Sequence, residues 1–159
     1  MIKPITITLI AFVGAFTGWT QQTVNSEKVE VDRGGQNPTD WVIYLDNEEF
    51  VIQYKFIQCD PRIGYDNESV LLKFKNKTSQ TLNIAWNIDL YYDGVCKTCD
   101  FPDEYHNALQ LNPMEEKEGN CDIYSDSKLK MFSKFVDQNY TKGLKLTSFK
   151  LSKLNLIIN

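Results

Sequence analysis

Alternation of large apolar residues with small or polar ones over positions 82–90 is the feature that most restricts how this chain can fold. Side chains two positions apart share one face of a β-strand, whereas in an α-helix they point in nearly opposite directions. Asp93 and Gly94, a pair typical of tight hairpin turns, follow the segment. The segment therefore predicts a half-buried strand that ends in a turn, with these residues on its apolar face: Leu82, Ile84, Trp86, Ile88 and Leu90.

Shorter segments with the same period occupy much of the chain after position 40. They cover residues 41–47, 50–59, 69–75, 106–111 and, with slips of phase typical of bulges or a bend, 144–158. Asn76-Lys77-Thr78 supplies a turn between two of them. No stretch predicts a long amphipathic helix. We therefore expect an all-β fold, an immunoglobulin-like antiparallel β-sandwich of about six to eight strands stapled by disulfides.

Residues 127–137 fit two patterns. Leu129, Met131 and Phe135 fit a strand with one polar position. Leu129, Phe132 and Val136 fit the face of a helix. The neighbouring strands favour the strand, and the sequence leaves the choice open.

The N-terminus predicts a signal peptide over residues 1–20. Lys3 supplies a positive start, an uncharged apolar run covers residues 5–16, and small residues surround a cut between Thr20 and Gln21. A run of about a dozen apolar residues suits a signal peptide, since a membrane-spanning helix needs roughly 20. An uncleaved membrane anchor is the alternative. We expect residues 21–40 to be a flexible lead-in with a short edge strand in KVEVD, and residues 41–159 to be the β-sandwich domain.

The charge balance bears on the partner. The chain of 159 residues has a net charge of −4, and removal of Lys3 with residues 1–20 leaves 16 basic residues against 21 acidic ones, a net charge of −5. Nucleic-acid binding needs a basic cluster that the sequence lacks. We expect a protein or glycan partner, no nucleic acid, no cofactor, and contact with a membrane only through the signal segment if it is uncleaved.

The chain has four cysteines, Cys59, Cys96, Cys99 and Cys121. An even number behind a signal peptide predicts disulfides, because the compartment outside the cytoplasm is oxidising. Four cysteines allow three pairings. We expect Cys99 to pair with Cys121, across the two ends of the strand at 106–111, and Cys59 to pair with Cys96.

Two chemical alternatives use the same residues. The Cys96-x-x-Cys99 pair has the spacing of thiol oxidoreductases, but no helix follows it, and Asp93 and Asp100 disfavour a thiolate. Cys96, Cys99, Cys121 and His106 have the ligand types of a tetrahedral zinc site. The spacing supplies only half of such a site, and export exposes thiols to oxidation. We therefore expect no metal and no catalytic residue.

Three further sets of residues have side chains that could form a site. His106, the single histidine, lacks the motif partners of a catalytic triad. Two groups of acidic residues could supply oxygen ligands for Ca²⁺: the first is Asp60, Asp66 and Glu68, and the second is Asp100, Asp103 and Glu104. Neither group has the spacing of an EF-hand, so we expect both to lie in solvated turns. Four aromatic residues could form a ligand platform: Trp41, Trp86, Tyr91 and Tyr92. The position of Trp86 in the middle of a strand face favours the core, and the adjacent Tyr91 and Tyr92 must face opposite sides of the sheet.

The order of these segments resembles small exported β-sandwich proteins of Bacteroidetes-type bacteria. The resemblance covers about residues 50–159, and its most specific part is the Cys-x-x-Cys with the later Gly-x-Cys at Gly119–Cys121. It implies an exported β-sandwich and carries no catalytic residues. We expect a non-catalytic binding or structural domain of the envelope or extracellular space, periplasmic, cell-surface or secreted; the alternative is a thiol-redox or metal-binding factor that uses Cys96 and Cys99.

Overall fold

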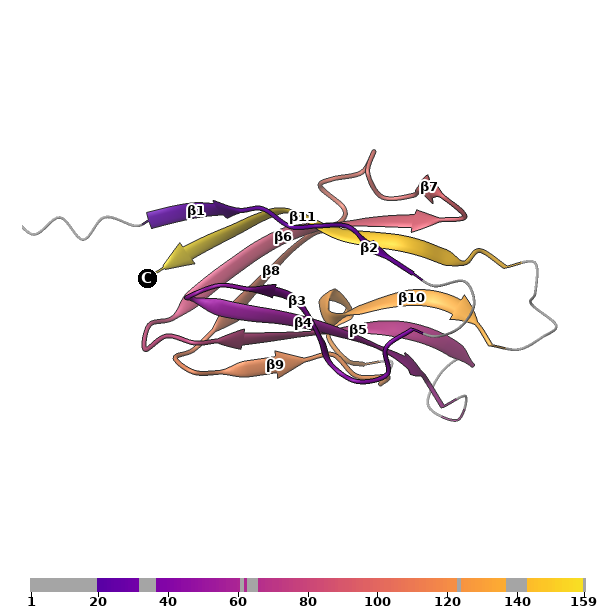
Figure 1. The fold of residues 1–159 in the computed structure, drawn as a ribbon, viewed down its shortest axis with the longest axis horizontal. Coiled ribbons are helices and arrows are strands. Elements are labelled where there is room, and N and C mark those ends of the chain that lie inside the picture. The colour runs from indigo at the N-terminus through magenta and orange to yellow at the C-terminus, as the bar shows by residue number, and fades with distance from the viewer. Residues whose placement is uncertain are drawn as a thin grey trace, which may run out of the picture.

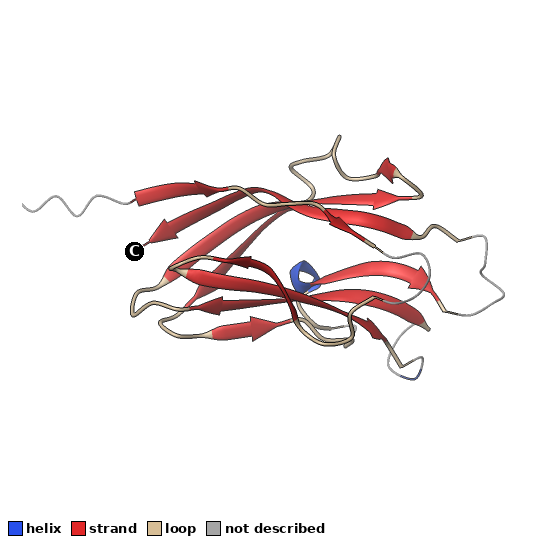
Figure 2. Ribbon diagram, in the orientation of Figure 1, coloured by secondary structure: helices blue, strands red, loops and turns tan. Residues whose placement is uncertain are grey.

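A computed structural model of the chain describes residues 20–31, 37–60, 62, 66–122, 124–136 and 143–158. These residues form two antiparallel β-sheets that lie face to face as two layers (Figure 1). Strands dominate, and a short 3-10 turn, Ser127–Leu129, comes before the tenth strand (Figure 2). The predicted all-β, disulfide-stapled sandwich is confirmed.

One layer, which we call the β6–β11 sheet, is built on two long strands that run antiparallel. Two strands lie one after the other along the outer edge of β11, and two more lie along the outer edge of β6. Its strands are β1 (Thr20–Val24), β2 (Val29–Glu30), β6 (Leu82–Tyr92), β7 (Val95–Cys96), β8 (His106–Leu111) and β11 (Leu146–Ile158).

The other layer, the β4–β5 sheet, follows the order β3-β4-β5-β10, with β9 also paired to β5. Its edges are therefore β3 on one side and β9 and β10 on the other. Its strands are β3 (Val42–Asp46), β4 (Phe50–Gln58), β5 (Asn67–Asn76), β9 (Glu116–Glu118) and β10 (Lys130–Phe135).

The core lies between the two layers. Every second residue of β6 from Leu82 to Ile88 is buried, as the alternation predicts. The Trp86 ring stacks on the Phe74 ring of β5, with the ring centroids 4.6 Å apart. Burial of such large rings removes much apolar surface from water, and the pair therefore joins the two sheets at the centre of the core.

The phase slips predicted for the last segment are β-bulges within one strand. Between Ser152 and Asn155 the chain advances three residues while β6 advances two, from Asn87 to Ala85. Lys153, inside this interval, has a positive φ of 49°. One extra residue returns the next apolar side chains to the core face, so Leu154 and Leu156 are fully buried.

Tyr44 of β3 fills a break in the β6–β11 sheet. β1 pairs with β11 from Leu154 onward and β2 pairs at Ser148 and Phe149, so Leu151, which pairs with Ile88 of β6 on one side, has no strand partner on the other side of β11. The Tyr44 hydroxyl accepts a hydrogen bond from the Leu151 N–H at 2.9 Å, and Ser26 Oγ donates to the Leu151 carbonyl. Burial, the largest cause, raises the pKa of Tyr44.

Two expectations need correction. The described residues form eleven strands rather than six to eight, because β2, β7 and β9 have only two or three residues each. We expected residues 21–40 to be a flexible lead-in, but their described part contains β1 and β2, and both strands pair with β11. The edge strand predicted in KVEVD corresponds to β2.

The segment 127–137 is a strand over residues 130–135. The predicted signal segment, 1–20, lies outside the described residues except for Thr20.

Candidate functional site

The Cys96–Cys99 loop is held on the end of β6. Asp93 and Gly94 both have positive φ, 50° and 84°, which is the geometry of the two-residue hairpin turn predicted for this pair. The turn leads into β7, and Cys96 is bonded to Cys99. We call residues 93–105 the disulfide loop.

Thr98, inside the disulfide ring, anchors the loop. Its side chain is buried; its hydroxyl donates to the Ile88 carbonyl at 2.7 Å and accepts from the Leu90 N–H at 2.8 Å. These are the backbone groups of β6 that lie between β7 and β8, where no ladder partner reaches them. The loop is therefore fixed both by the disulfide and by its contact with the sheet.

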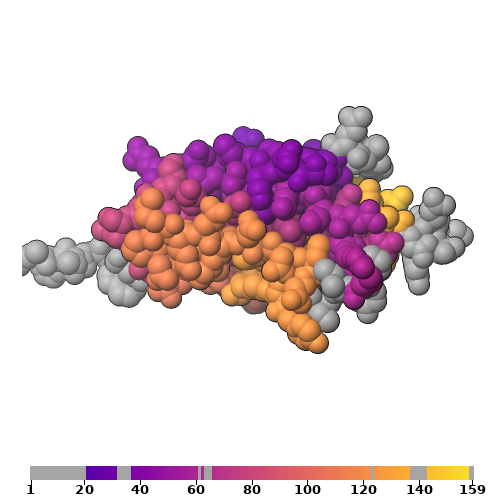
Figure 3. Space-filling model, turned by 90° about the horizontal axis from the view of Figure 1, so that it is seen from below, coloured from indigo at the N-terminus to yellow at the C-terminus, as the bar shows by residue number. Residues whose placement is uncertain are grey.

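The second bridge joins Cys59 to Cys121, which are 62 positions apart in the chain. Cys59 follows β4 and Cys121 follows β9, and both strands pair with β5. The predicted pairing of Cys99 with Cys121 and of Cys59 with Cys96 is wrong, because the strand order places Cys59 and Cys121 together on the β4–β5 sheet. All four cysteines are nevertheless in disulfides. On the face viewed in Figure 3, residues of the 106–135 region lie beside those of the β3–β4 region.

The residues of the alternative metal site are not brought together. Cys121 belongs to the bridge with Cys59, whereas Cys96 is bonded to Cys99 on the other sheet. His106 Nδ1 lies 3.0 Å from Asn87 Oδ1 on the outer face of β6. Across the described ranges, no three His, Cys, Asp or Glu side chains are placed to hold one metal ion.

The aromatic platform is also divided by the fold. Trp86 is fully buried in the core, as predicted. Trp41 lies on the β4–β5 sheet, where Lys55 Nζ and Lys73 Nζ are 4.4 and 4.3 Å from its ring centroid. Tyr91 lies on the β6–β11 sheet, with its hydroxyl 3.8 Å from Cys99 Sγ. Tyr92 points between the sheets, so the four rings cannot bind one ligand together.

A groove of about 330 Å³ opens between β6 and β10 at the side of the sandwich. This volume is within the range of about 300–1,000 Å³ that is typical of ligand sites. Its lining joins five apolar or aromatic side chains that are buried or half-buried, which we call the inner residues, to five polar or amphipathic ones, which we call the rim residues. The inner residues are Ile88, Leu90, Tyr92, Met131 and Phe132, and the rim residues are Glu104, Tyr105, Asn107, Ser127 and Lys130.

Tyr92 closes the inner end of the groove. Its hydroxyl donates to the Phe132 carbonyl at 2.7 Å, and its ring stacks on the Phe132 ring with the centroids 6.3 Å apart. Burial, with a smaller effect of nearby Tyr105, raises the pKa of Tyr92 to about 12. The phenol therefore stays neutral and keeps β10 joined to β6 below strongly alkaline pH.

The rim contains one carboxylate, Glu104, and one lysine, Lys130. Glu104 follows Asp100 and Asp103 in the disulfide loop, and all three carboxylates are exposed. None of them forms an ion pair with another described residue. Across the groove, Lys130 Nζ donates to the Asp122 carbonyl at 2.9 Å. Glu104 therefore places a negative charge on one side of the groove, and Asp100 and Asp103 add negative charge to the loop next to it.

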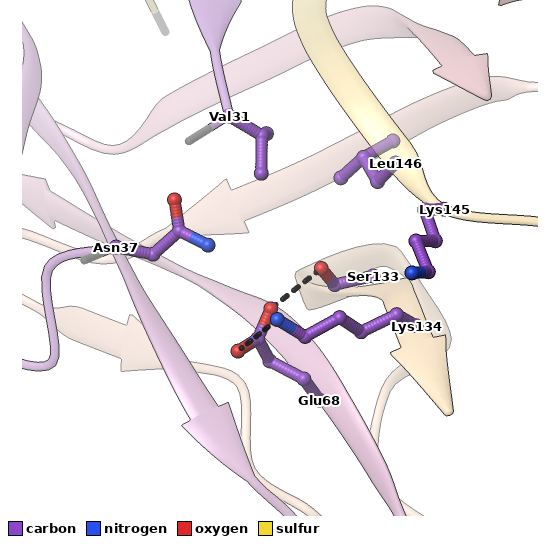
Figure 4. Close-up of a pocket in the computed structure, with 7 residues that line it drawn as sticks. All are labelled: Val31, Asn37, Glu68, Ser133, Lys134, Lys145 and Leu146. Carbon is purple, nitrogen blue, oxygen red and sulfur yellow. Dashed lines mark hydrogen bonds and ion pairs between the residues drawn. The ribbon is translucent and has the colours of Figure 1, made fainter. Parts of the chain in front are cut away.

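A second hollow lies at the end of the sandwich around Glu68 (Figure 4). Ser133 Oγ donates to Glu68 Oε1 at 2.8 Å, and Lys134 Nζ lies 3.5 Å from Glu68 Oε2. The hollow has a volume of about 50 Å³, which suffices for a few water molecules but not for an organic ligand. Glu68 is thus a structural carboxylate.

The acidic group predicted around Asp60, Asp66 and Glu68 does not form a cation site. Asp60 pairs with Arg62, and Asp66 Oδ1 accepts from Gln58 Nε2 at 3.0 Å. Glu68 is bonded to Ser133 and Lys134, and the three carboxylates are not placed to hold one metal ion. They behave as turn and strand-pairing residues.

Sequence reasoning missed the groove. The sequence pattern predicts that Ile88 and Leu90 belong to the strand core and that Glu104 lies in a solvated turn. The single signal in the sequence is that the apolar face of β6 continues through Leu90 and Tyr92, beyond the end of β8. Nothing in the sequence shows that β10 stands across from these residues.

Fold and site together define a disulfide-stapled β-sandwich with a lateral apolar groove. No family model, curated protein or solved structure matches the chain. In the part of the chain that the structure covers, no helix combines the length and hydropathy needed to cross a membrane.

Proposed function

We propose that this chain is an exported, non-catalytic binding domain that holds its partner in the groove between β6 and β10. The observation that carries the proposal is the groove itself, which combines an apolar inner surface with a polar rim. Such a combination is typical of ligand-binding sites, where apolar contact supplies affinity and a few polar groups supply orientation.

Export is supported by three features. The first 20 residues have the pattern of a signal peptide. Both cysteine pairs are bonded, as is usual in oxidising compartments. The segment order resembles exported β-sandwich proteins of Bacteroidetes-type bacteria, and we retain the immunoglobulin-like relationship as part of the same proposal.

The thiol-redox alternative has less support. A reactive Cys-x-x-Cys pair has a thiolate of lowered pKa, usually at the N-terminus of a helix. Here Cys96 ends β7 and Cys99 lies in a turn. Asp93 and Asp100 flank the pair, and their charge would oppose a thiolate.

The proposal is tested by photo-crosslinking in the organism that encodes the chain. A benzophenone amino acid at Ser127, on the groove rim, should yield a covalent adduct on irradiation. The same amino acid at Lys75, exposed on β5 away from the groove, is the matched control and should yield none. The intact mass should correspond to a chain that starts at Gln21. Equal adducts at both positions, or none, would overturn the binding site, and a mass that retains residues 1–20 would overturn processing.

A further inference from the structure

We infer that the groove binds an extended peptide of a partner protein, which inserts one apolar side chain and places a lysine or arginine beside it against the disulfide loop. This inference rests on the proposed function and names the chemistry of its partner. Three properties of the site carry it: the apolar inner residues, the negative charge of the disulfide loop and the anchoring of that loop on β6.

The inner surface favours an apolar side chain over a sugar. Ile88, Leu90 and Met131 offer no polar atom to a ligand, and the polar side chains lie at the rim. Sugar hydroxyls buried there would lose their hydrogen bonds to water without replacement, which is costly. One large apolar side chain buried in a pocket is the usual anchor of a protein interface.

The rim favours a cationic neighbour for that anchor. Asp100, Asp103 and Glu104 lie within one short loop, are exposed and have no ion-pair partner among the described residues. Lys97 lies in the same loop, and Lys130 is bonded to the Asp122 carbonyl. Two further lysines nearby already have acidic partners, Lys28 with Glu30 and Lys128 with Asp126. Charge complementarity therefore selects a basic segment and speeds its encounter with the groove.

The disulfide loop extends the contact surface beyond the groove. Val95 and Phe101 are 55% and 52% exposed, although both are apolar. Tyr105, whose N–H donates to the Phe101 carbonyl at 3.3 Å, lines the groove. The Cys96–Cys99 bond and the Thr98 anchor hold this loop on β6. A loop ordered in advance loses little conformational entropy when a partner binds.

Addition of a strand to the β10 edge is not the mode of binding that we propose. The Phe132 carbonyl on β10 already accepts from the Tyr92 hydroxyl. The bulge between Phe132 and Lys134 also interrupts the regular spacing of the strand. Features of this kind protect an edge from pairing with another strand. Recognition should therefore depend on side chains rather than on backbone pairing.

The test is an NMR titration of the ¹⁵N-labelled, disulfide-intact protein with capped pentapeptides. The probe is acetyl-Gly-Lys-Phe-Lys-Gly-amide. One comparison peptide replaces both lysines by glutamate, and the other replaces phenylalanine by glycine. We expect amide shifts at Leu90, Tyr105 and Met131 with the probe, and affinities about tenfold or more weaker for each comparison peptide.

Variants locate the effect on the rim. Glu104→Gln should weaken the probe about two- to fivefold at low salt, as for one exposed ion pair, and added salt should reduce the difference. Glu48→Gln removes an exposed carboxylate from the β3–β4 turn and should leave the affinity unchanged. The Cys96→Ser/Cys99→Ser variant should bind more weakly, because its loop is no longer ordered in advance.

Three results would overturn the inference. They are absence of shifts at the groove, equal affinity for the glutamate peptide, and shifts at the groove caused by a chitin or cellulose hexasaccharide but not by the probe. The last result would leave the proposed function intact, since crosslinking from Ser127 would still detect a groove partner. If both the crosslinking and the peptide binding fail, the proposed function is overturned as well.

Discussion

Tyr92 performs two tasks at one position. Its ring forms part of the groove, and its hydroxyl bonds to the backbone of the opposite sheet through the Phe132 carbonyl. Because the hydroxyl donates this bond, only the neutral phenol can make it. The residue therefore couples the protonation state of one side chain to the contact between β6 and β10.

This coupling predicts a loss of stability at alkaline pH. The folded-state pKa of Tyr92 is about 12, above the ordinary value of 10.0, so folding favours the neutral form. Its contribution is complete below pH 10 and is lost as the pH rises through about 12. Tyr92→Phe should therefore lose less unfolding free energy than the native chain between these pH values, as measured by denaturant titration.

Tyr124→Phe is the control for this comparison, since Tyr124 is 89% exposed. It should follow the native pH dependence. Parallel curves for the native chain and Tyr92→Phe would contradict the assignment.

At the scale of the elements, two glycines allow the chain to turn or to pass close to its neighbours where a strand ends. The Asp93-Gly94 turn reverses the chain within two residues and starts the disulfide loop. At Gly119, after β9, the backbone passes close to the 3-10 turn: a Cβ there would lie 2.1 Å from the Leu129 carbonyl oxygen. The two glycines are thus required for different reasons, one for backbone conformation and one for space.

Two alanine substitutions separate these reasons. Gly94→Ala should cost about 1 kcal/mol, because a Cβ there meets no atom within 4 Å and only the positive φ is strained. Gly119→Ala should cost at least about 3 kcal/mol, because backbone must move to relieve the overlap. Denaturant unfolding of both variants checks the order, and a smaller cost at Gly119 would contradict it. Gly94→Asn, which tolerates positive φ better, should cost less than Gly94→Ala.

At the scale of the whole molecule, the two disulfides constrain the chain to very different extents. The Cys59–Cys121 bridge closes a loop over 62 positions, and the Cys96–Cys99 bridge closes one over three. In the chain-entropy description, stabilisation grows with the length of the closed loop. The long bridge should therefore stabilise the fold, and the short one should chiefly order its own loop.

The corresponding prediction compares two double variants. Cys59→Ser/Cys121→Ser should lower the unfolding free energy by about 4 kcal/mol, and Cys96→Ser/Cys99→Ser by about 2 kcal/mol. Both should still fold, because a domain of this size buries a large part of its surface without bridges. Equilibrium unfolding measures both values. A larger loss from the Cys96–Cys99 pair would contradict this division of roles.

The sequence alone determined the local structure. The period-two pattern identified β4, β5, β6 and β8, and the phase slips identified the bulges of β11, because side-chain alternation is a property of the extended backbone itself. Asp93-Gly94 specified its turn for the same local reason. The even number of cysteines indicated complete pairing.

Only the tertiary structure decided which of these parts meet. The partner of Cys59 depends on the positions of β4 and β9 on either side of β5, and the groove depends on the position of β10 across from Leu90 and Tyr92. β1 also forms only because β11 supplies an edge for a polar segment with little strand signal of its own. Strand order is selected by burial of the two faces together, which depends on residues far apart in the chain and leaves no periodic trace in any one segment.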